Sequence, residues 1–240
     1  MVKISERLRT AAGLIGEGER LADVGTDHGY VPIYLVERKR IPSAIAMDIR
    51  TGPLERAREH IRMYDMEDYI QTRLSDGVAA LKPGEADAIL IAGMGGGLVI
   101  HILESGRAIC EQAHGLVLQP QSELPKVRRF LMENGYVTER EEMVMEDGKY
   151  YPMMRVHFDA SAVSHADSFT EEQELEFRYG KQLLTEKHPV LLAYLRWEVQ
   201  IQQDILTQLS GQPATEQIAA RIDDVKQILA QNARALAYYE

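Results

Sequence analysis

Up to Asn134 the chain alternates between short apolar segments and longer amphipathic ones. Apolar residues at helical spacing predict helices over 3–15, 31–37, 52–64, 98–111 and 124–134, and short apolar runs predict strands over 20–25, 43–49, 69–74, 86–92 and 115–119. Two further strands, 136–145 and 151–158, flank an Asp147-Gly148 pair that is typical of hairpin turns. This alternation predicts an α/β fold, in which a mostly parallel sheet has helices on both faces and an antiparallel pair at its end.

The C-terminal part differs, because little strand signal remains after Thr170. Thr170 and Gln173 have the spacing of a capping box, so a helix is expected to begin there, and Pro189 is expected to break it. Two sets of residues in the last helix repeat every seven positions: Ile222, Leu229 and Leu236, and Ile218, Val225 and Asn232. Such a seam predicts a coiled-coil-like helical hairpin. We therefore expect an α/β domain over residues 1–160 and a helical hairpin domain over 161–240.

Composition narrows the classes of function. The 27 Lys and Arg against 37 Asp and Glu give a net charge of −10, which argues against a uniformly basic surface but allows local basic clusters. The single cysteine, Cys110, permits neither an internal disulfide nor a cysteine zinc site, and the histidines show no metal-ligand spacing. No apolar stretch is long enough to span a membrane, and charges throughout the N-terminus argue against a signal peptide. These features predict a cytoplasmic protein with no metal and no membrane segment.

Four segments that follow predicted strands carry glycines or acidic residues. They are the Gly25–Gly29 turn, Asp48, the Asp76-Gly77 pair and the run Ala92–Gly97. In open α/β sheets, ligands bind at the carboxyl ends of the strands, and an acidic residue after the second strand can accept both hydroxyls of a ribose. The glycine pattern of dinucleotide-binding sites is incomplete here, because the first loop lacks a full G-x-G-x-x-G. The sequence therefore favours a nucleoside-like cofactor over a pyridine dinucleotide.

The segments LADVGTDHGYVP (residues 21–32) and IAGMGGG (residues 91–97), with GKYYPMMRV (residues 148–156), carry a resemblance that covers roughly the whole chain. The sequence resembles class I S-adenosylmethionine-dependent methyltransferases of Rossmann-like fold. It is most similar to the bacterial TrmK family, which methylates N1 of adenine 22 in tRNA. One departure from the general class I pattern is Asp27, which stands where most members have a second glycine.

The resemblance implies S-adenosylmethionine as the cofactor and assigns a part of it to each segment. Gly25, Thr26, Asp27 and Gly29 would wrap the methionine part. Asp48 would hold the ribose hydroxyls, Ile49 would lie beside the adenine, and Asp76 and Gly77 would meet the adenine edge. Ala92, Gly93 and Met94 would line the floor near the transferred methyl group.

The chemistry indicates which side chains would be catalytic. Neutral adenine N1 has a lone pair and no proton, so methyl transfer to it needs no general base. The protein must instead position N1 and stabilise the charge that develops on the adenine. Asp27 is the first candidate, as a carboxylate that accepts a hydrogen bond from the adenine amino group, although it could merely cap the next helix. Gln119 and Gln121 are candidates for hydrogen bonds to the edge of the target adenine. Tyr30, Tyr150 and Tyr151 are candidates for stacking on a flipped-out base, although strands favour tyrosine in any case.

We expect tRNA as the substrate, and the hairpin domain as a possible contact for the tRNA body. Residues 161–240 have seven Lys and Arg against twelve Asp and Glu, so most phosphate contacts are expected from the basic clusters of the first domain, Lys3, Arg7 and Arg9, and Lys126 to Arg129. Two other functions remain open from the residues: methylation of a small molecule or a protein, and a non-catalytic role in binding cofactor or RNA. A monomer is favoured, because the hairpin supplies its own facing stripe.

Overall fold

The computed structural model describes residues 2–164, 168–213 and 215–240. The chain forms two compact units, Met1–Ser168 and Phe169–Glu240. The boundary expected after Ala160 falls in a segment that packs back on unit 1: the Asp159 amide donates to the Gly135 carbonyl and the Ser164 amide to the Met132 carbonyl. None of the helices among the described residues combines the length and apolar character that a membrane span requires.

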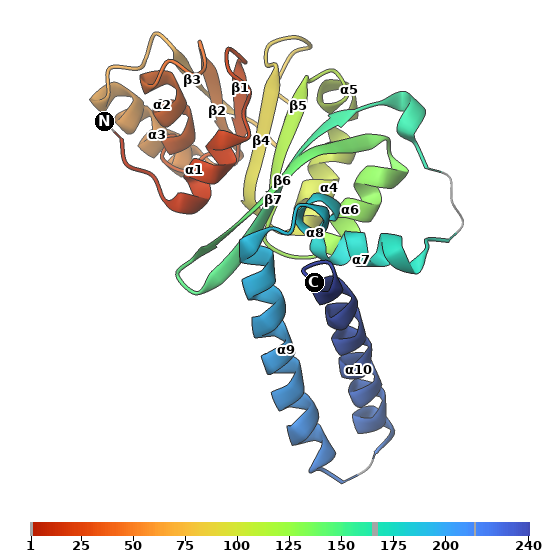
Figure 1. Cartoon of the computed structure of the whole chain (residues 1–240). Coiled ribbons are helices and arrows are strands. Elements are labelled where there is room, and N and C mark those ends of the chain that lie inside the picture. The colour runs from red at the N-terminus through yellow and green to blue at the C-terminus, as the bar shows by residue number, and fades with distance from the viewer. Residues whose placement is uncertain (1, 165–167, 214) are drawn as a thin grey trace. The chain divides into compact units, whose positions relative to one another are not determined.

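Unit 1 is the α/β fold expected from the sequence, built on a seven-stranded sheet (Figure 1). In chain order, its elements are α1 (Glu6–Gly13), β1 (Leu21–Val24), α2 (Tyr30–Glu37), β2 (Ala44–Asp48), α3 (Thr51–Met63), β3 (Ile70–Leu74), β4 (Ala88–Met94), α4 (Gly96–Ser105), α5 (Arg107–Cys110), β5 (Gly115–Pro120), α6 (Leu124–Glu133), β6 (Tyr136–Glu146) and β7 (Lys149–Phe158). The strand order is β3-β2-β1-β4-β5-β7-β6, and the first five strands are parallel. β6 and β7 form the predicted antiparallel hairpin, and β7 pairs antiparallel with β5.

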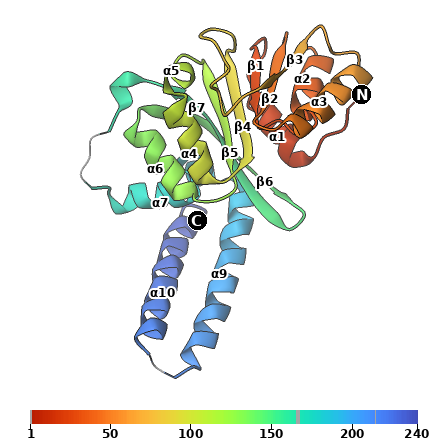
Figure 2. The same ribbon diagram turned by 180° about the vertical axis from the view of Figure 1, so that it is seen from behind.

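The sheet separates two apolar cores because successive strand residues point to opposite faces. Leu21, Ala88 and Leu90 belong to one core, whereas their neighbours in sequence, Ala22 and Ile89, belong to the other. Figures 1 and 2 show α1, α2 and α3 over the first face, and α4 and α6 over the second. Both faces of the central strands are therefore buried, which explains their continuous apolar sequences.

Unit 2 is helical, with α7 (Glu171–Tyr179), α8 (Lys181–Thr185), α9 (Pro189–Ser210) and α10 (Glu216–Ala237). Thr170 and Gln173 form the expected capping box, and α9 begins at Pro189. The sequence missed a further break at Gly180, whose φ of 95° ends α7. Val225 and Asn232 of the predicted seam are fully buried on α10, and Leu191 and Leu195 are buried on α9.

Candidate active site at the carboxyl edge of the sheet

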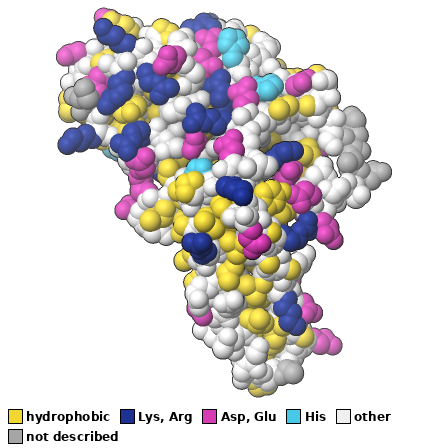
Figure 3. Space-filling view, viewed as in Figure 1, with side chains coloured by type: hydrophobic (Ala, Val, Ile, Leu, Met, Phe, Trp, Pro, Cys, Tyr) yellow, Lys and Arg dark blue, Asp and Glu magenta, His cyan; other side chains and the backbone are white. Residues whose placement is uncertain are grey.

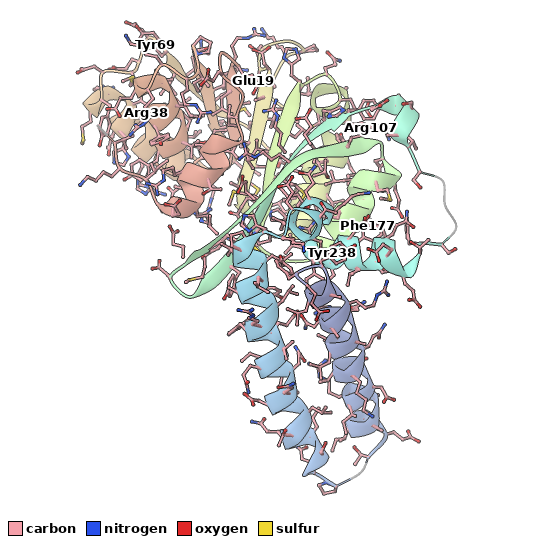
Figure 4. All side chains as sticks on the ribbon, in the orientation of Figure 1. Glu19, Arg38, Tyr69, Arg107, Phe177 and Tyr238 are labelled. Carbon is pink, nitrogen blue, oxygen red and sulfur yellow. The ribbon has the colours of Figure 1, made fainter. Side chains whose placement is uncertain are left out.

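A cavity of about 370 Å³ opens at the carboxyl ends of β1 and β4. Glu19 and Tyr69 precede β1 and β3 and mark the opposite, amino edge in Figure 4. The cavity is lined from α1, from the β1–α2 loop, from β4 and from the segment after β5: Arg7, Leu8, Asp23, Gly25, Thr26, Asp27, His28, Tyr30, Val31, Leu90, Ala92, Gly93 and Gln121. It thus brings together predicted residues from the first and fourth of the four segments.

The β1–α2 loop is held tightly against β2. The amides of Gly25 and Thr26 both donate to the Met47 carbonyl, at 2.8 Å each. Gly25 has a φ of 75°, and a Cβ at this position would lie 2.1 Å from the methyl carbon of Met94. The left-handed backbone therefore favours glycine, and an added methyl group would also displace the flexible end of the Met94 side chain.

Asp23 and Asp48 are buried carboxylates at the ends of β1 and β2. Burial, reinforced by repulsion from Asp48, raises the pKa of Asp23 to about 6. Asp48 accepts a hydrogen bond from the Arg50 amide at 2.8 Å. The expected ribose-binding carboxylate is thus fixed at the tip of its strand by a neighbouring amide.

The ends of β2 and β3 form an exposed apolar shelf next to these carboxylates. Ile49 is 60% exposed and Leu74 is 55% exposed, so two large apolar side chains meet solvent at the ends of neighbouring strands. Asp76 is also exposed, in a loop that the buried Ser75 shapes: its hydroxyl donates to the Gly77 carbonyl and accepts from the Ala80 amide. Asp48, Ile49, Asp76 and Gly77 do not line the cavity itself but continue the same edge of the sheet.

Gly93 forms the floor of the cavity on the β4–β5 side, and Gln119 supports it from beneath. Gly93 has a φ of 78° and produces a bulge between Ala92 and Met94. Gln119, on β5, is fully buried. Its side-chain oxygen accepts from the Gly93 amide at 3.2 Å and from Nη1 of Arg7 at 2.8 Å. The structure thus places Gln119 beneath the floor, while Gln121 lines the cavity.

Asp27 lies at the rim, with its side chain 62% exposed. Its Oδ1 accepts from Nη2 of Arg56 at 2.9 Å and lies 3.4 Å from Nε2 of His28. The rings of His28, Tyr30 and His60 stack, with centroids 5.0 to 5.1 Å apart. Of the tyrosines considered for base stacking, Tyr30 lines the cavity, and Tyr151 lies under the Arg7 guanidinium, 5.5 Å from ring centroid to Cζ.

Sequence reasoning missed two features of the basic residues. Arg7 was expected on the RNA-binding surface, but it lines the cavity. Its spacing from Ile4 and Ala11 by three and four residues places it on the core side of α1, and this signal could have found it. Arg128, expected among the phosphate contacts, is buried against Glu141 at 2.9 Å. No helical spacing reveals that pair, because Glu141 comes from β6.

The cavity and the shelf fit S-adenosylmethionine on three observations of this structure. Thr26 lines the cavity with its hydroxyl buried beside the Asp23 carboxylate, so the lining is polar on the β1 side. The buried Asp23 carboxylate lines a cavity that would receive a cationic ligand. The exposed Ile49 offers an apolar surface for a base. Across the described ranges, no group of three or more His, Cys, Asp or Glu side chains is arranged to hold a metal ion.

Comparison with known proteins agrees with this geometry. Residues 4–154 match a methyltransferase domain family. The chain is 34% identical to the tRNA (adenine(22)-N(1))-methyltransferase of Bacillus subtilis, over 95% of this chain and 98% of that protein. The crystal structure of the Bacillus subtilis m1A22 tRNA methyltransferase TrmK superposes with a TM-score of 0.81 at 32% identity, covering 98% of this chain and 99% of that one.

A protein from Streptococcus pneumoniae, provisionally assigned as a tRNA (m1A22) methyltransferase, was solved in complex with S-adenosyl-L-methionine. It is 31% identical, with a TM-score of 0.78 over 95% of this chain and all of that one. Similarity at this level extends over nearly the whole length of the chain. The chain therefore belongs to the TrmK family of S-adenosylmethionine-dependent tRNA (adenine(22)-N(1))-methyltransferases.

Proposed function

We propose that this protein transfers a methyl group from S-adenosylmethionine to N1 of adenine 22 in tRNA. The observation that carries the proposal is the cavity at the carboxyl edge, in a chain similar over nearly its full length to a tRNA (adenine(22)-N(1))-methyltransferase. Mass mapping of nucleosides in unmodified tRNA incubated with the purified protein tests it. The expected product is one 1-methyladenosine per tRNA, at position 22. Methyl transfer to small metabolites or proteins and not to tRNA would contradict it, as would cofactor binding without turnover.

The reaction requires placement and charge stabilisation. Bound S-adenosylmethionine supplies a methyl group on a sulfonium centre, and the positive charge ends on the adenine once N1 is methylated. The protein must therefore align N1 with the methyl group and stabilise a base that becomes cationic. A carboxylate that accepts a hydrogen bond from the adenine amino group does this, because the bond strengthens as charge develops on the ring.

Asp27 is the residue that we assign to this role. It lies at the rim with its carboxylate exposed, and Arg56 and His28 hold its Oδ1 in place. Tyr30 would stack on the flipped base. Gln119 would support the floor of the cavity from below by accepting hydrogen bonds from the Gly93 amide and Arg7. Gln121 would hydrogen-bond to the edge of the target adenine.

Replacing Asp27 with Ala tests the assignment. We expect the turnover number to fall at least about 100-fold, as is typical when an electrostatic contact to the reacting group is removed. Affinity for S-adenosylmethionine, measured by calorimetry, should change little. Glu59→Ala, which removes an exposed carboxylate from α3, is the control and should leave both quantities unchanged. Loss of cofactor affinity and turnover together in Asp27→Ala would make Asp27 a cofactor residue instead.

The tRNA would be held by exposed cations on elements that border the cavity. Figure 3 shows Lys and Arg side chains gathered over the α1–α3 side of unit 1. Lys3 is exposed, and the side chains of Arg9 and Lys126 are 56% and 64% exposed. These three cations are the phosphate contacts that we propose, without Arg7 and Arg128.

We further propose that the protein works in the cytoplasm as a monomer. Analytical ultracentrifugation would test the monomeric state.

A further inference from the structure

Arg7 is the only Lys or Arg among the described residues that line the cavity. It comes from α1, which precedes the first strand, and its Nη1 donates to the buried side-chain oxygen of Gln119 at 2.8 Å. The guanidinium also lies over the Tyr151 ring, 5.5 Å from its centroid. A buried acceptor and an aromatic face thus fix the Arg7 side chain. By contrast, Arg9 on the same helix is largely exposed and pairs with Glu6.

The guanidinium points to one end of the cavity. A Cβ built on Gly93 would lie 3.8 Å from Nη1 of Arg7 and 3.7 Å from the side-chain nitrogen of Gln121. Arg7 and Gln121 therefore both present N–H groups above the floor at β4. A guanidinium carries five N–H donors, so the bond to Gln119 leaves donors that can reach an anion in the cavity.

The order of strands indicates which part of the cofactor lies there. Asp48 and Asp76 follow β2 and β3, Gly25 follows β1, and Gly93 is on β4, in the spatial order β3-β2-β1-β4. Neighbouring strands are about 4.8 Å apart. A cofactor with its adenosine over β2 and β3 would extend its methionine part past β1 towards β4, where Arg7 lies.

The charges of the lining match those of that methionine part. Its sulfonium and ammonium groups are cationic, and the buried Asp23 carboxylate lines the cavity on the β1 side. Its carboxylate is the one anionic group of the cofactor, and Arg7 faces the cavity on the β4 side. A guanidinium fork matches the geometry of a carboxylate better than any other side chain does. An RNA phosphate would instead be met by the exposed cations outside the cavity.

Resting on the proposed function, we infer that Arg7 binds the carboxylate of the cofactor's methionine moiety, and that Gln119 orients Arg7 for this contact. Arg7 is then a cofactor-binding residue that favours ligands with the methionine carboxylate over ligands that lack it. Gln119 becomes a positioning residue, because its one side-chain oxygen holds both Arg7 and the Gly93 amide.

Calorimetry on the full chain with S-adenosylmethionine and with decarboxylated S-adenosylmethionine tests the inference without any turnover. Loss of one charge-assisted contact predicts that the wild-type protein binds the complete cofactor about 10- to 100-fold more tightly than the decarboxylated one. Arg7→Met should bring this ratio close to one by weakening only the complete cofactor. Arg9→Met, which removes the neighbouring cation on the same helix, is the matched control and should keep the wild-type ratio. Circular dichroism verifies that each variant is folded.

Several results would overturn the inference. Equal affinity of the wild-type protein for the two ligands would do so without any variant, and would leave methyl transfer to tRNA unaffected. An Arg7→Met variant that keeps the wild-type ratio and loses tRNA affinity would assign Arg7 to an RNA phosphate. If Arg7→Met does not fold, Arg7→Lys replaces it: the charge is kept but the fork is lost, so the ratio should fall, and an unchanged ratio would contradict the contact. A wild-type protein that binds neither ligand would instead overturn the proposed function.

Discussion

At the scale of single residues, Gly25 has two separate reasons to be glycine, and a matched pair of variants separates them. Gly25 and Gly84 have nearly equal φ angles, 75° and 76°, but a Cβ on Gly84 would meet nothing within 4 Å. Alanine at either position strains the backbone by about 1 kcal/mol. Only Gly25→Ala also pushes aside the Met94 methyl group, which is the flexible end of a side chain predicted to lie near the transferred methyl group. We expect affinity for S-adenosylmethionine to fall by up to about tenfold in Gly25→Ala. Gly84→Ala should bind normally in the same titration, and equal affinities would contradict this packing role.

Asp23 gives a prediction for pH. Its pKa is raised to about 6, so between roughly pH 4 and 6 the folded protein holds a proton that the unfolded chain has released. The contribution of Asp23 to stability is therefore present at low pH and is lost as pH rises through 6. Asp23→Asn should raise the ligand-free free energy of unfolding by roughly 2–3 kcal/mol at pH 7.5 and by only about 1 kcal/mol at pH 4.5. Urea unfolding across this range measures the difference from wild type. The exposed Asp76→Asn is the control, and a difference for Asp23→Asn that does not vary with pH would refute the explanation.

At the scale of elements, a buried carboxylate joins three helices of unit 2. Glu198 on α9 is 6% exposed and accepts from Arg178 at 2.8 Å, Tyr179 at 3.0 Å, Tyr194 at 2.9 Å and Asn232 at 3.1 Å. Burial, with the negative charge of Glu198, raises the pKa of Tyr179. The polar Asn232 of the α10 seam thus has a partner, which explains how the apolar repeat tolerates it.

Removing this carboxylate should loosen the hairpin. Glu198→Ala leaves several buried donors without an acceptor, which costs roughly 3–5 kcal/mol. Trp197 is the one tryptophan of the chain and lies next to Glu198, so its fluorescence reports the unfolding of unit 2. We expect the transition to occur at lower urea in Glu198→Ala. Asp204→Asn, on an exposed part of α9, should unfold like wild type. Coincident transitions for Glu198→Ala and wild type would show that the cluster contributes little.

The elements were more predictable from the sequence than the contacts between them. Strands and helices follow from apolar spacing, which is local, so the alternation up to Asn134 and the β6–β7 hairpin were found. The break at Gly180 was missed because a glycine inside a helical pattern signals a break only when its φ is positive. Pairs such as Arg128 with Glu141, and Arg7 with Gln119, join residues that are distant in sequence, and spacing carries no information about them.

At the scale of the whole molecule, a chain of net charge −10 must bind a polyanion through a local surface. Each phosphate contact releases condensed counterions, so the logarithm of affinity falls linearly with the logarithm of salt concentration. Of the exposed cations, Arg9 lies on α1, which lines the cavity, Lys3 precedes that helix, and Lys126 lies on α6, which follows the cavity residue Gln121. Lys39, Lys82 and Arg107 are equally exposed cations, but they come from segments towards the amino edge of the sheet.

Two triple variants therefore compare the same loss of charge at different places. Replacing Lys3, Arg9 and Lys126 with Gln should reduce the salt slope of tRNA binding by about 2–3, because roughly 0.7–0.9 is lost for each contact. Replacing Lys39, Lys82 and Arg107 with Gln changes the net charge equally and should leave the slope close to that of wild type. Filter binding of unmodified tRNA at several salt concentrations measures both slopes. A similar reduction in the two variants would mean that net charge governs binding, and a reduction confined to the second would place the tRNA at the amino edge.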